Sequence, residues 1–331
     1  MHNIITTENI LLIGALLLFV AVMAGKAAYR FGAPALLFFL GVGMLFGINF
    51  ISFHSVEATQ FVGMIALCII LFTGGMDTKF SEIRPVIGPG IVLATAGVVM
   101  TAVIVAGFVT LIAPWVGLAV SFPAALLLAA TMSSTDSASV FSILRSKGVL
   151  LKENLRPTLE LESGSNDPMA YMLTLILIAV IQSGGMSVPQ AALMLILQLV
   201  IGAIGGFLFG KAIVWLVNKI DIDNASLYPI LILACSFFTF SVVTLVKGNG
   251  YLAVYIAGLI FGNSKIVHKR SIGTFFDGFT WLWQIVMFIT LGLLVNPHEL
   301  IPVTHIGLFI GVFMILVARP LSVFHLVASI P

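Results

Sequence analysis

Charged residues are scarce in this sequence. Only 8% of its 331 residues are Asp, Glu, Lys or Arg, against about 25% in an average soluble domain. The hydrophobic fraction is 60% and the mean hydropathy is +1.18. This composition excludes a water-soluble globule, so we predict an all-α polytopic membrane protein whose main partner is lipid.

Cysteine and net charge are also low. The two cysteines, Cys68 and Cys235, lie in separate apolar runs, which favours packing over a disulfide or a metal site. The histidines are scattered without ligand spacing, so no metal centre or cofactor is expected. A net charge of +2 gives no reason to expect a nucleic-acid partner.

Long apolar runs fill most of the chain. A helix needs about 20 residues to cross the hydrocarbon of a bilayer, and runs separated by charged or Gly/Pro-containing breaks predict eleven spans. These lie near residues 8–25, 33–50, 56–75, 88–113, 122–145, 157–182, 188–217, 226–246, 251–264, 273–295 and 303–325. No basic stretch precedes the first run, which predicts a retained helix rather than a cleaved signal peptide.

The basic residues alternate between the two sides of this arrangement. Thirteen of the fifteen Lys and Arg residues fall at connections after odd-numbered spans, while Lys247 alone follows an even-numbered span and Arg319 lies within the last span. Because cytoplasmic connections carry the excess of Lys and Arg, this pattern predicts an N-terminus outside the cell.

The fifth span contains an unexpected polar stretch. Seven of the nine residues from Thr131 to Ser139 are polar, and Asp136 lies among them, well inside a hydrocarbon-length run. Ser, Thr and Asp favour caps and turns over helix interiors, so we predict an unwound stretch of the kind that forms cation sites in transporters. The alternative is a kinked helix in which the hydroxyls bond back to their own turns and Asp136 caps the kink.

The sixth span contains a second buried acid, Asp167. An acid inside a membrane span is costly and marks a functional site by default. Glu162 and Asn166 share one helical face, as do Ser163 and Asp167. Pro168 weakens the helix next to Asp167. Because Asp136 and Asp167 lie at similar predicted depths, we expect the two acids to meet.

Arg319 is the one charge in the last apolar run. It needs a route to the surface or an acidic partner. Both Arg319 and Glu162 fall in the cytoplasmic half of their spans, so we predict an ion pair between them. In the seventh span, Gly202, Gly206 and Gly210 recur every four residues, which favours close packing within the bundle and leaves a dimer contact open.

Two long motifs, residues 133–146 and 159–171, resemble the monovalent cation:proton antiporter superfamily, supported by residues 72–77 and 318–321. Within it, they are similar to the NhaP-like branch, which includes bacterial potassium/proton antiporters of the cell-volume-regulation type. The eleven-span layout agrees with this resemblance over residues 1–331, which we interpret as one transmembrane exchanger domain. The expected location is the inner (plasma) membrane, and the expected assembly is a homodimer.

The resemblance implies roles for individual residues. Asp167 would carry the proton or the cation, and Thr135 and Asp136 would come from the unwound stretch. Ser163 would add an oxygen ligand and Asn166 would stabilise the crossing. Glu162 and Arg319 would form a structural ion pair. A neighbouring Asn and Asp, in place of two Asp residues, is the pattern of electroneutral relatives and implies one proton per cation.

Two positions depart from the family pattern. Thr73 stands where many relatives have an acid, which puts a third carboxylate in doubt, and Ser137 stands where others have Pro. Relatives have thirteen spans in two inverted repeats with a second broken helix, so we expect further spans, and a cytosolic regulatory domain, beyond residue 331.

The favoured function is therefore antiport of potassium or sodium against protons by a transporter that is not an enzyme. A cation channel or a cation-coupled solute symporter is the main alternative, although the sequence has no pore-loop repeat and no evident polar site for an organic solute. A membrane interaction protein would leave both acids unexplained. Ion-dependent transport with sodium, potassium and lithium separates these classes.

Overall fold

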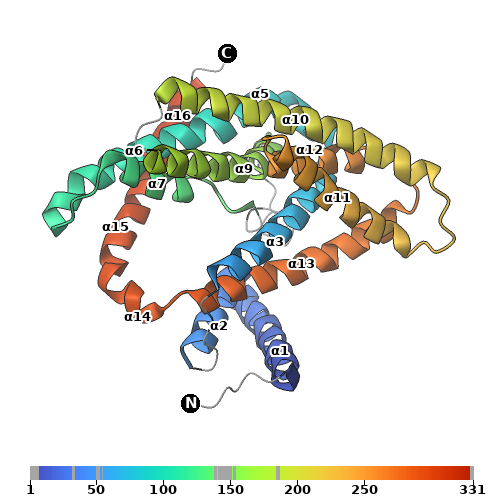
Figure 1. Ribbon diagram of the computed structural model, residues 1–331, viewed down its shortest axis with the longest axis horizontal. Coiled ribbons are helices and arrows are strands. Elements are labelled where there is room, and N and C mark those ends of the chain that lie inside the picture. Colours follow the sequence, from blue (N-terminus) through green and yellow to red (C-terminus); the bar gives the residue numbers. More distant parts are fainter. Residues whose placement is uncertain are drawn as a thin grey trace. The chain divides into compact units, whose positions relative to one another are not determined.

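The structure is a computed structural model that describes residues 7–31, 34–49, 53, 55–137, 140, 151, 154–183 and 187–328. In these residues all regular secondary structure is helical (Figure 1). The chain forms two compact units, one of residues 1–70 and 274–304 and the other of residues 71–273 and 305–331. Three of the described helices have residues in both units: α3 (Val56–Asp77), α13 (Lys269–Leu294) and α15 (Thr304–Phe313), of which only Thr304 belongs to the first.

The first unit contains α1 (Thr7–Phe31), α2 (Ala35–Asn49), α14 (Pro297–Leu300) and the larger parts of α3 and α13. Two helix backbones approach closely where α2 meets α13. A Cβ atom added to Gly43 would lie 2.3 Å from the Ile289 carbonyl oxygen, and one added to Gly292 would lie 2.2 Å from the Leu40 carbonyl oxygen. Glycine is required here because the two backbones touch.

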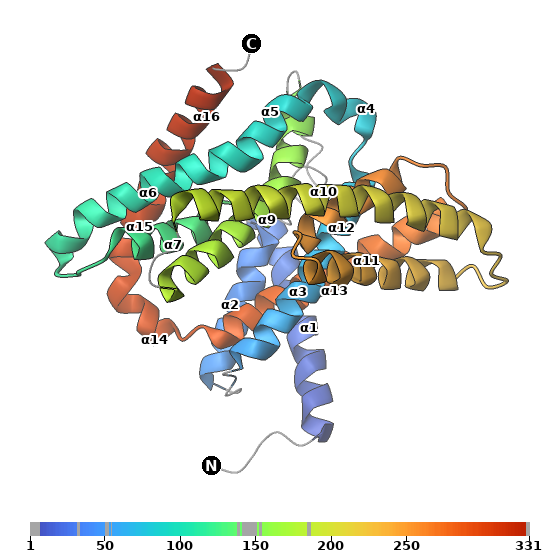
Figure 2. The ribbon, with the colours of Figure 1, turned by 45° about the horizontal axis from the view of Figure 1, so that its top comes forward.

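The second unit contains the helices that hold the polar motifs. They are α4 (Phe80–Ile83), α5 (Ile87–Val92), α6 (Val98–Ile112), α7 (Phe122–Met132), α9 (Leu155–Gln182), α10 (Val188–Lys219), α11 (Leu227–Leu245), α12 (Gly250–Gly262), α15 (Thr304–Phe313) and α16 (Arg319–Ala328). Short π-helical turns, Leu93–Gly97 and Met314–Ala318, connect α5 to α6 and α15 to α16. Figure 2 shows α10 passing alongside α9 and α12, with which it packs.

The described helices agree with the predicted spans. Eight are long and apolar enough to cross a membrane, and three shorter apolar helices cover residues 35–47, 122–132 and 250–262. Each of these eleven overlaps one predicted run, although the ends differ. The fourth span starts at Phe80 rather than 88. The residues before 88 include the charged Glu82 and Arg84, and they form a short α-helix and a 3-10 turn that lead into the apolar run. The helix of the fifth run is interrupted after Met132, and residues 138–139 and 141–145 of that run lie outside the described residues.

The glycines of α10 face α12. Gly202, Gly206 and Gly210 are buried, and a Cβ atom on Gly206 would lie 2.6 Å from the Ala253 carbonyl oxygen. Similar contacts, to Asn249 and Ala257, surround Gly202 and Gly210. The prediction that this glycine face packs within the bundle is confirmed.

Candidate functional site

The candidate site is built where the chain leaves α7. After Met132 the backbone is not helical from Ser133 to Asp136, and helical geometry resumes at Ser137. Val140 N–H donates to the Asp136 carbonyl oxygen over 3.1 Å, an α-helical bond that spans the restart. The predicted loss of helix in the polar stretch is therefore present. The predicted span beyond it, at residues 138–139 and 141–145, lies outside the described residues.

The hydroxyl groups of this stretch have two different uses. Thr131 and Ser133 donate to carbonyl oxygens of their own helix, at Leu128 over 2.7 Å and Ala130 over 2.8 Å. These two behave as the kinked-helix alternative requires. Thr135 instead reaches across to α9, so part of the polar stretch closes the end of α7 and part contacts its neighbour.

Thr135 meets one face of α9. Asn166 donates its side-chain N–H to Thr135 Oγ1 over 2.7 Å, and Thr135 Oγ1 lies 3.3 Å from both Glu162 Oε2 and Ser163 Oγ. Glu162, Ser163 and Asn166 are buried, at 7%, 0% and 0% exposure. Four of the predicted site residues are thus brought together around one hydroxyl group, as the i, i+4 spacing on α9 allows.

Asp167 lies next to this group and faces the helix restart. The Ser137 backbone N–H donates to Asp167 Oδ2 over 3.2 Å. A first-turn N–H has no acceptor within its own helix and carries partial positive charge, so it suits a carboxylate. Asp167 is half-buried and is followed by Pro168 inside α9, whereas the Asp136 side chain is exposed. The break thus presents a backbone donor to Asp167, a contact with no sequence signal.

Glu162 joins the site to α16. Arg319 Nη1 lies 3.2 Å from Glu162 Oε1, and the side chains are 20% and 9% exposed. The same carboxylate oxygen accepts from Asn166 over 2.8 Å. The expected proximity of Glu162 and Arg319 is present, and it ties α9 to the helix that follows the second π-helical turn.

The chemistry of the site is that of hard oxygen ligands. The hydroxyl groups of Thr135 and Ser163 and the Asp167 carboxylate offer oxygen atoms, which suit alkali and alkaline-earth cations better than soft metals. Among the described residues no group of three or more His, Cys, Asp or Glu side chains could hold a metal ion. A carboxylate at such a site can take up either a proton or a cation.

Comparison with known proteins agrees with this architecture. Residues 15–330 match the family model described as "sodium/hydrogen exchanger, transmembrane". A K⁺/H⁺ antiporter NhaP of Alkalimonas amylolytica is 40% identical over 318 residues, covering 95% of this chain and 54% of that protein. A K⁺/H⁺ antiporter NhaP2 of Shewanella oneidensis is 37% identical over 321 residues, with coverage of 96% and 54%.

A solved structure shares the fold. The sodium proton antiporter MjNhaP1 of Methanocaldococcus jannaschii superimposes with a TM-score of 0.79 at 24% identity, covering 98% of this chain and 82% of that one. Fold and site together define a multi-pass helical membrane protein with a carboxylate at a helix break. The chain belongs to the transmembrane sodium/hydrogen exchanger family. It spans about half the length of the curated relatives it matches.

Proposed function

We propose that the protein exchanges a monovalent cation, potassium or sodium, for protons across the bacterial plasma membrane. The observation that carries this proposal is the half-buried Asp167 carboxylate, which faces the helix restart at Ser137 beside a cluster of oxygen ligands. Family membership and the names of the relatives, which are K⁺/H⁺ antiporters, support it.

Asp167 is the proposed exchange group. Thr135, Asp136 and Ser163 would supply further oxygen atoms to the cation. Asn166 would hold the break against α9, since its amide bonds both Thr135 and Glu162. Glu162 and Arg319 would form the structural ion pair that keeps α16 in place. No cofactor is required by these roles.

The proposed mechanism is competition for one carboxylate. Asp167 is neutralised either by a proton or by a cation, and the empty, charged form crosses poorly because a bare charge is costly in the membrane. Exchange follows when the loaded site opens alternately to each side. One acid with a neutral Asn166 beside it gives one proton per cation, so the exchange is electroneutral.

The orientation and assembly are also part of the proposal. The thirteen basic residues after odd-numbered spans support a cytoplasmic location for those connections and an N-terminus outside the cell. A homodimer is proposed from the family resemblance. Labelling of single cysteines from each side of the membrane checks the orientation, and the mass of the detergent-solubilised protein checks the assembly.

Proteoliposomes with an acidic lumen and a trapped pH dye test the exchange. Addition of external K⁺ or Na⁺ should raise the luminal pH with the native protein, and Li⁺ extends the selectivity series. Asp167→Asn should abolish the signal. Asp223→Asn, at an exposed residue in the connection after α10, is the matched control and should exchange normally. Cation/proton exchange at the native rate in Asp167→Asn would contradict the mechanism. So would an exchange rate in the native protein that changes with an imposed membrane potential.

A further inference from the structure

Asn249 forms the junction of three helices. It is the N-cap of α12, where its side-chain oxygen accepts from the Leu252 backbone N–H over 3.0 Å. Its side-chain N–H donates to the Pro168 carbonyl oxygen of α9 over 3.0 Å. Its backbone N–H donates to the Gln198 carbonyl oxygen of α10, also over 3.0 Å. The residue is only 4% exposed.

The direction of the Asn249 amide is fixed by its partners. A backbone N–H such as that of Leu252 can only donate, and a carbonyl such as that of Pro168 can only accept. A flipped amide would leave both groups facing the wrong atoms. The side chain therefore has one arrangement that satisfies α9 and α12 together.

The α10 side of the junction is held closely. A Cβ atom on Gly202 would lie 2.8 Å from the Asn249 carbonyl oxygen, so the glycine allows the Asn249 backbone to lie against α10. Because α10 and α12 also pack through Gly206 and Gly210, Asn249 has a fixed position from which to contact α9.

The bond to α9 is made at the proline inside that helix. Pro168 has no N–H, so α9 lacks the ladder bond to the Gly164 carbonyl, and proline inside a helix permits bending. Pro168 directly follows Asp167. A hydrogen bond from outside α9 to the Pro168 carbonyl oxygen limits how the helix bends or turns there, and hence where the Asp167 carboxylate points.

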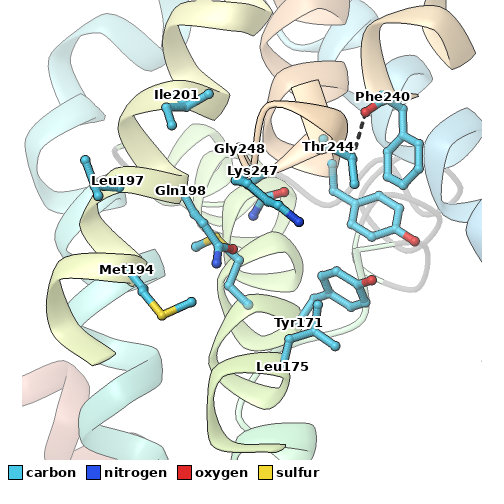
Figure 3. A pocket seen from close by; sticks show the side chains of 14 residues that line it. Tyr171, Leu175, Met194, Leu197, Gln198, Ile201, Phe240, Thr244, Lys247 and Gly248 are labelled. Atoms are coloured by element: carbon cyan, nitrogen blue, oxygen red, sulfur yellow. Dashed lines mark hydrogen bonds between the residues drawn. The ribbon is translucent and has the colours of Figure 1, made fainter. Parts of the chain in front are cut away.

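The same junction borders a cavity. A cavity of about 560 Å³ lies between α9, α10, α11 and α12, and Asn249 contributes to its lining together with Tyr171 and Gln198, which are labelled in Figure 3. Shortening the Asn249 side chain would enlarge this space. Because Pro168 lies inside α9, its carbonyl oxygen is also the α-helical acceptor for the N–H four residues later, so removing the Asn249 donor does not leave that oxygen unsatisfied.

We propose that Asn249 is a positioning residue for cation exchange, which fixes α9 at Pro168 and thereby holds the Asp167 carboxylate toward the Ser137 N–H. This inference rests on the proposed function of Asp167. Asn249 does not contact the transported ion in this proposal. It acts on the Asp167 carboxylate through the backbone of α9.

Two substitutions separate the cap of α12 from the bond to α9. Asn249→Ser keeps a good N-cap acceptor but is too short to reach Pro168. Asn249→Asp keeps the size and the acceptor but replaces the amide donor with an oxygen atom. Asn249→Ala removes both interactions. Asn296→Ser is the matched control, since Asn296 caps α14 by accepting from the His298 N–H and makes no bond to α9.

The expected result in proteoliposomes is a raised cation KM. Asn249→Ser should increase it by about tenfold, the effect of losing one hydrogen bond of ordinary strength. Asn249→Asp should increase it at least as much, because its second carboxylate oxygen also faces the Pro168 carbonyl oxygen. Asn296→Ser should leave it unchanged. A purely structural role would lower the amount of active protein, and so the maximal rate, with the native KM. That result, or an unchanged KM and rate, overturns the proposal.

A second measurement does not depend on transport. Hydrogen–deuterium exchange of backbone amides in residues 169–174 should be faster in Asn249→Ser than in the native protein, whereas exchange at Leu252 should stay slow because the cap is kept. Unchanged exchange in residues 169–174 overturns the positioning role. Absence of cation exchange by the native protein would instead refute the proposed function, so the two failures are distinguishable.

Discussion

The hydroxyl groups of Thr101 and Ser322 lie 3.0 Å apart and join helices that are 221 residues apart in the sequence. Ser322 also donates to the Arg319 carbonyl oxygen over 2.9 Å. Since a serine has one hydroxyl hydrogen, Thr101 must be the donor between the two. Both residues are buried, at 0% and 1% exposure, so this contact fixes the first turn of α16, from which Arg319 reaches Glu162.

Thr101→Val should destabilise the protein. The change keeps the shape of the side chain and removes a buried donor, which costs about 1–2 kcal/mol of the free energy of unfolding. Thermal unfolding in detergent measures the loss. Thr110→Val in the same helix is the control, since the bond of Thr110 among the described residues is to the Ala106 carbonyl one turn earlier, and its loss should matter less. Additive losses in Thr101→Val with Ser322→Ala would contradict the pairing.

Arg319→Met should destabilise the protein more than the double change Arg319→Met with Glu162→Gln. The single change leaves a buried carboxylate without its counter-charge, which costs about 3–5 kcal/mol, whereas removing both charges avoids most of that penalty. Chemical or thermal unfolding gives the comparison. Arg156→Met breaks a more exposed pair with Glu160 and should cost about 1 kcal/mol or less. If Arg319→Met and Arg156→Met lower the free energy of unfolding equally, burial does not strengthen the Arg319–Glu162 pair.

Gly206→Ala should weaken the packing of α10 on α12. The added methyl group would lie 2.6 Å from the Ala253 carbonyl oxygen and 2.8 Å from the Ala253 Cα atom, so the helices must separate, at a cost of about 1–3 kcal/mol. Gly107→Ala in α6 meets no atom within 4 Å and should be neutral or stabilising. The melting temperature of Gly206→Ala should therefore be lower than that of Gly107→Ala. A Gly206→Ala protein as stable as the native one would contradict the close backbone contact between α10 and α12.

Lys247→Gly should stabilise the end of α11. Lys247 has a φ of +63°, the Gly248 N–H donates to the Val243 carbonyl over 2.8 Å and the Lys247 N–H to the Thr244 carbonyl over 3.0 Å. These bonds form a Schellman motif, in which glycine is preferred at the left-handed position. Relief of that backbone cost gives a gain of about 1 kcal/mol. Lys247→Ala also removes the amine but keeps the strained backbone, so it should give no gain in melting temperature.

Hydropathy was sufficient to locate the helices. The eleven predicted runs overlap eleven described apolar helices because a membrane span must be both long and apolar. Helix ends are less predictable, as at Phe80, since charged residues such as Glu82 and Arg84 can continue a helix beyond its apolar run. The two π-helical turns were not predicted, because Leu93–Gly97 and Met314–Ala318 have no distinguishing composition.

The site was partly predictable for a related reason. A charge in an apolar span has few neutralising partners, so Glu162 could be paired with Arg319 from the sequence, and their contact is present. The roles of these residues and of Asp136 stay predictions. Contacts made by backbone atoms, such as the Ser137 N–H on Asp167, leave no sequence signal. Nor do single polar residues with ordinary neighbours, such as Thr101 and Asn249.

The π-helical turn at Met314–Ala318 fixes the angular register of everything that follows it. A π turn accommodates one residue more than an α turn, and each residue of an α-helix rotates the chain by about 100°. Deleting one residue from this turn would therefore restore an ordinary α-helical turn and leave the guanidinium group of Arg319 directed toward Glu162. The same deletion in α15, where each residue contributes its full rotation, would turn Arg319 away from Glu162. The two positions differ in the length changes they tolerate, although their hydropathy is alike.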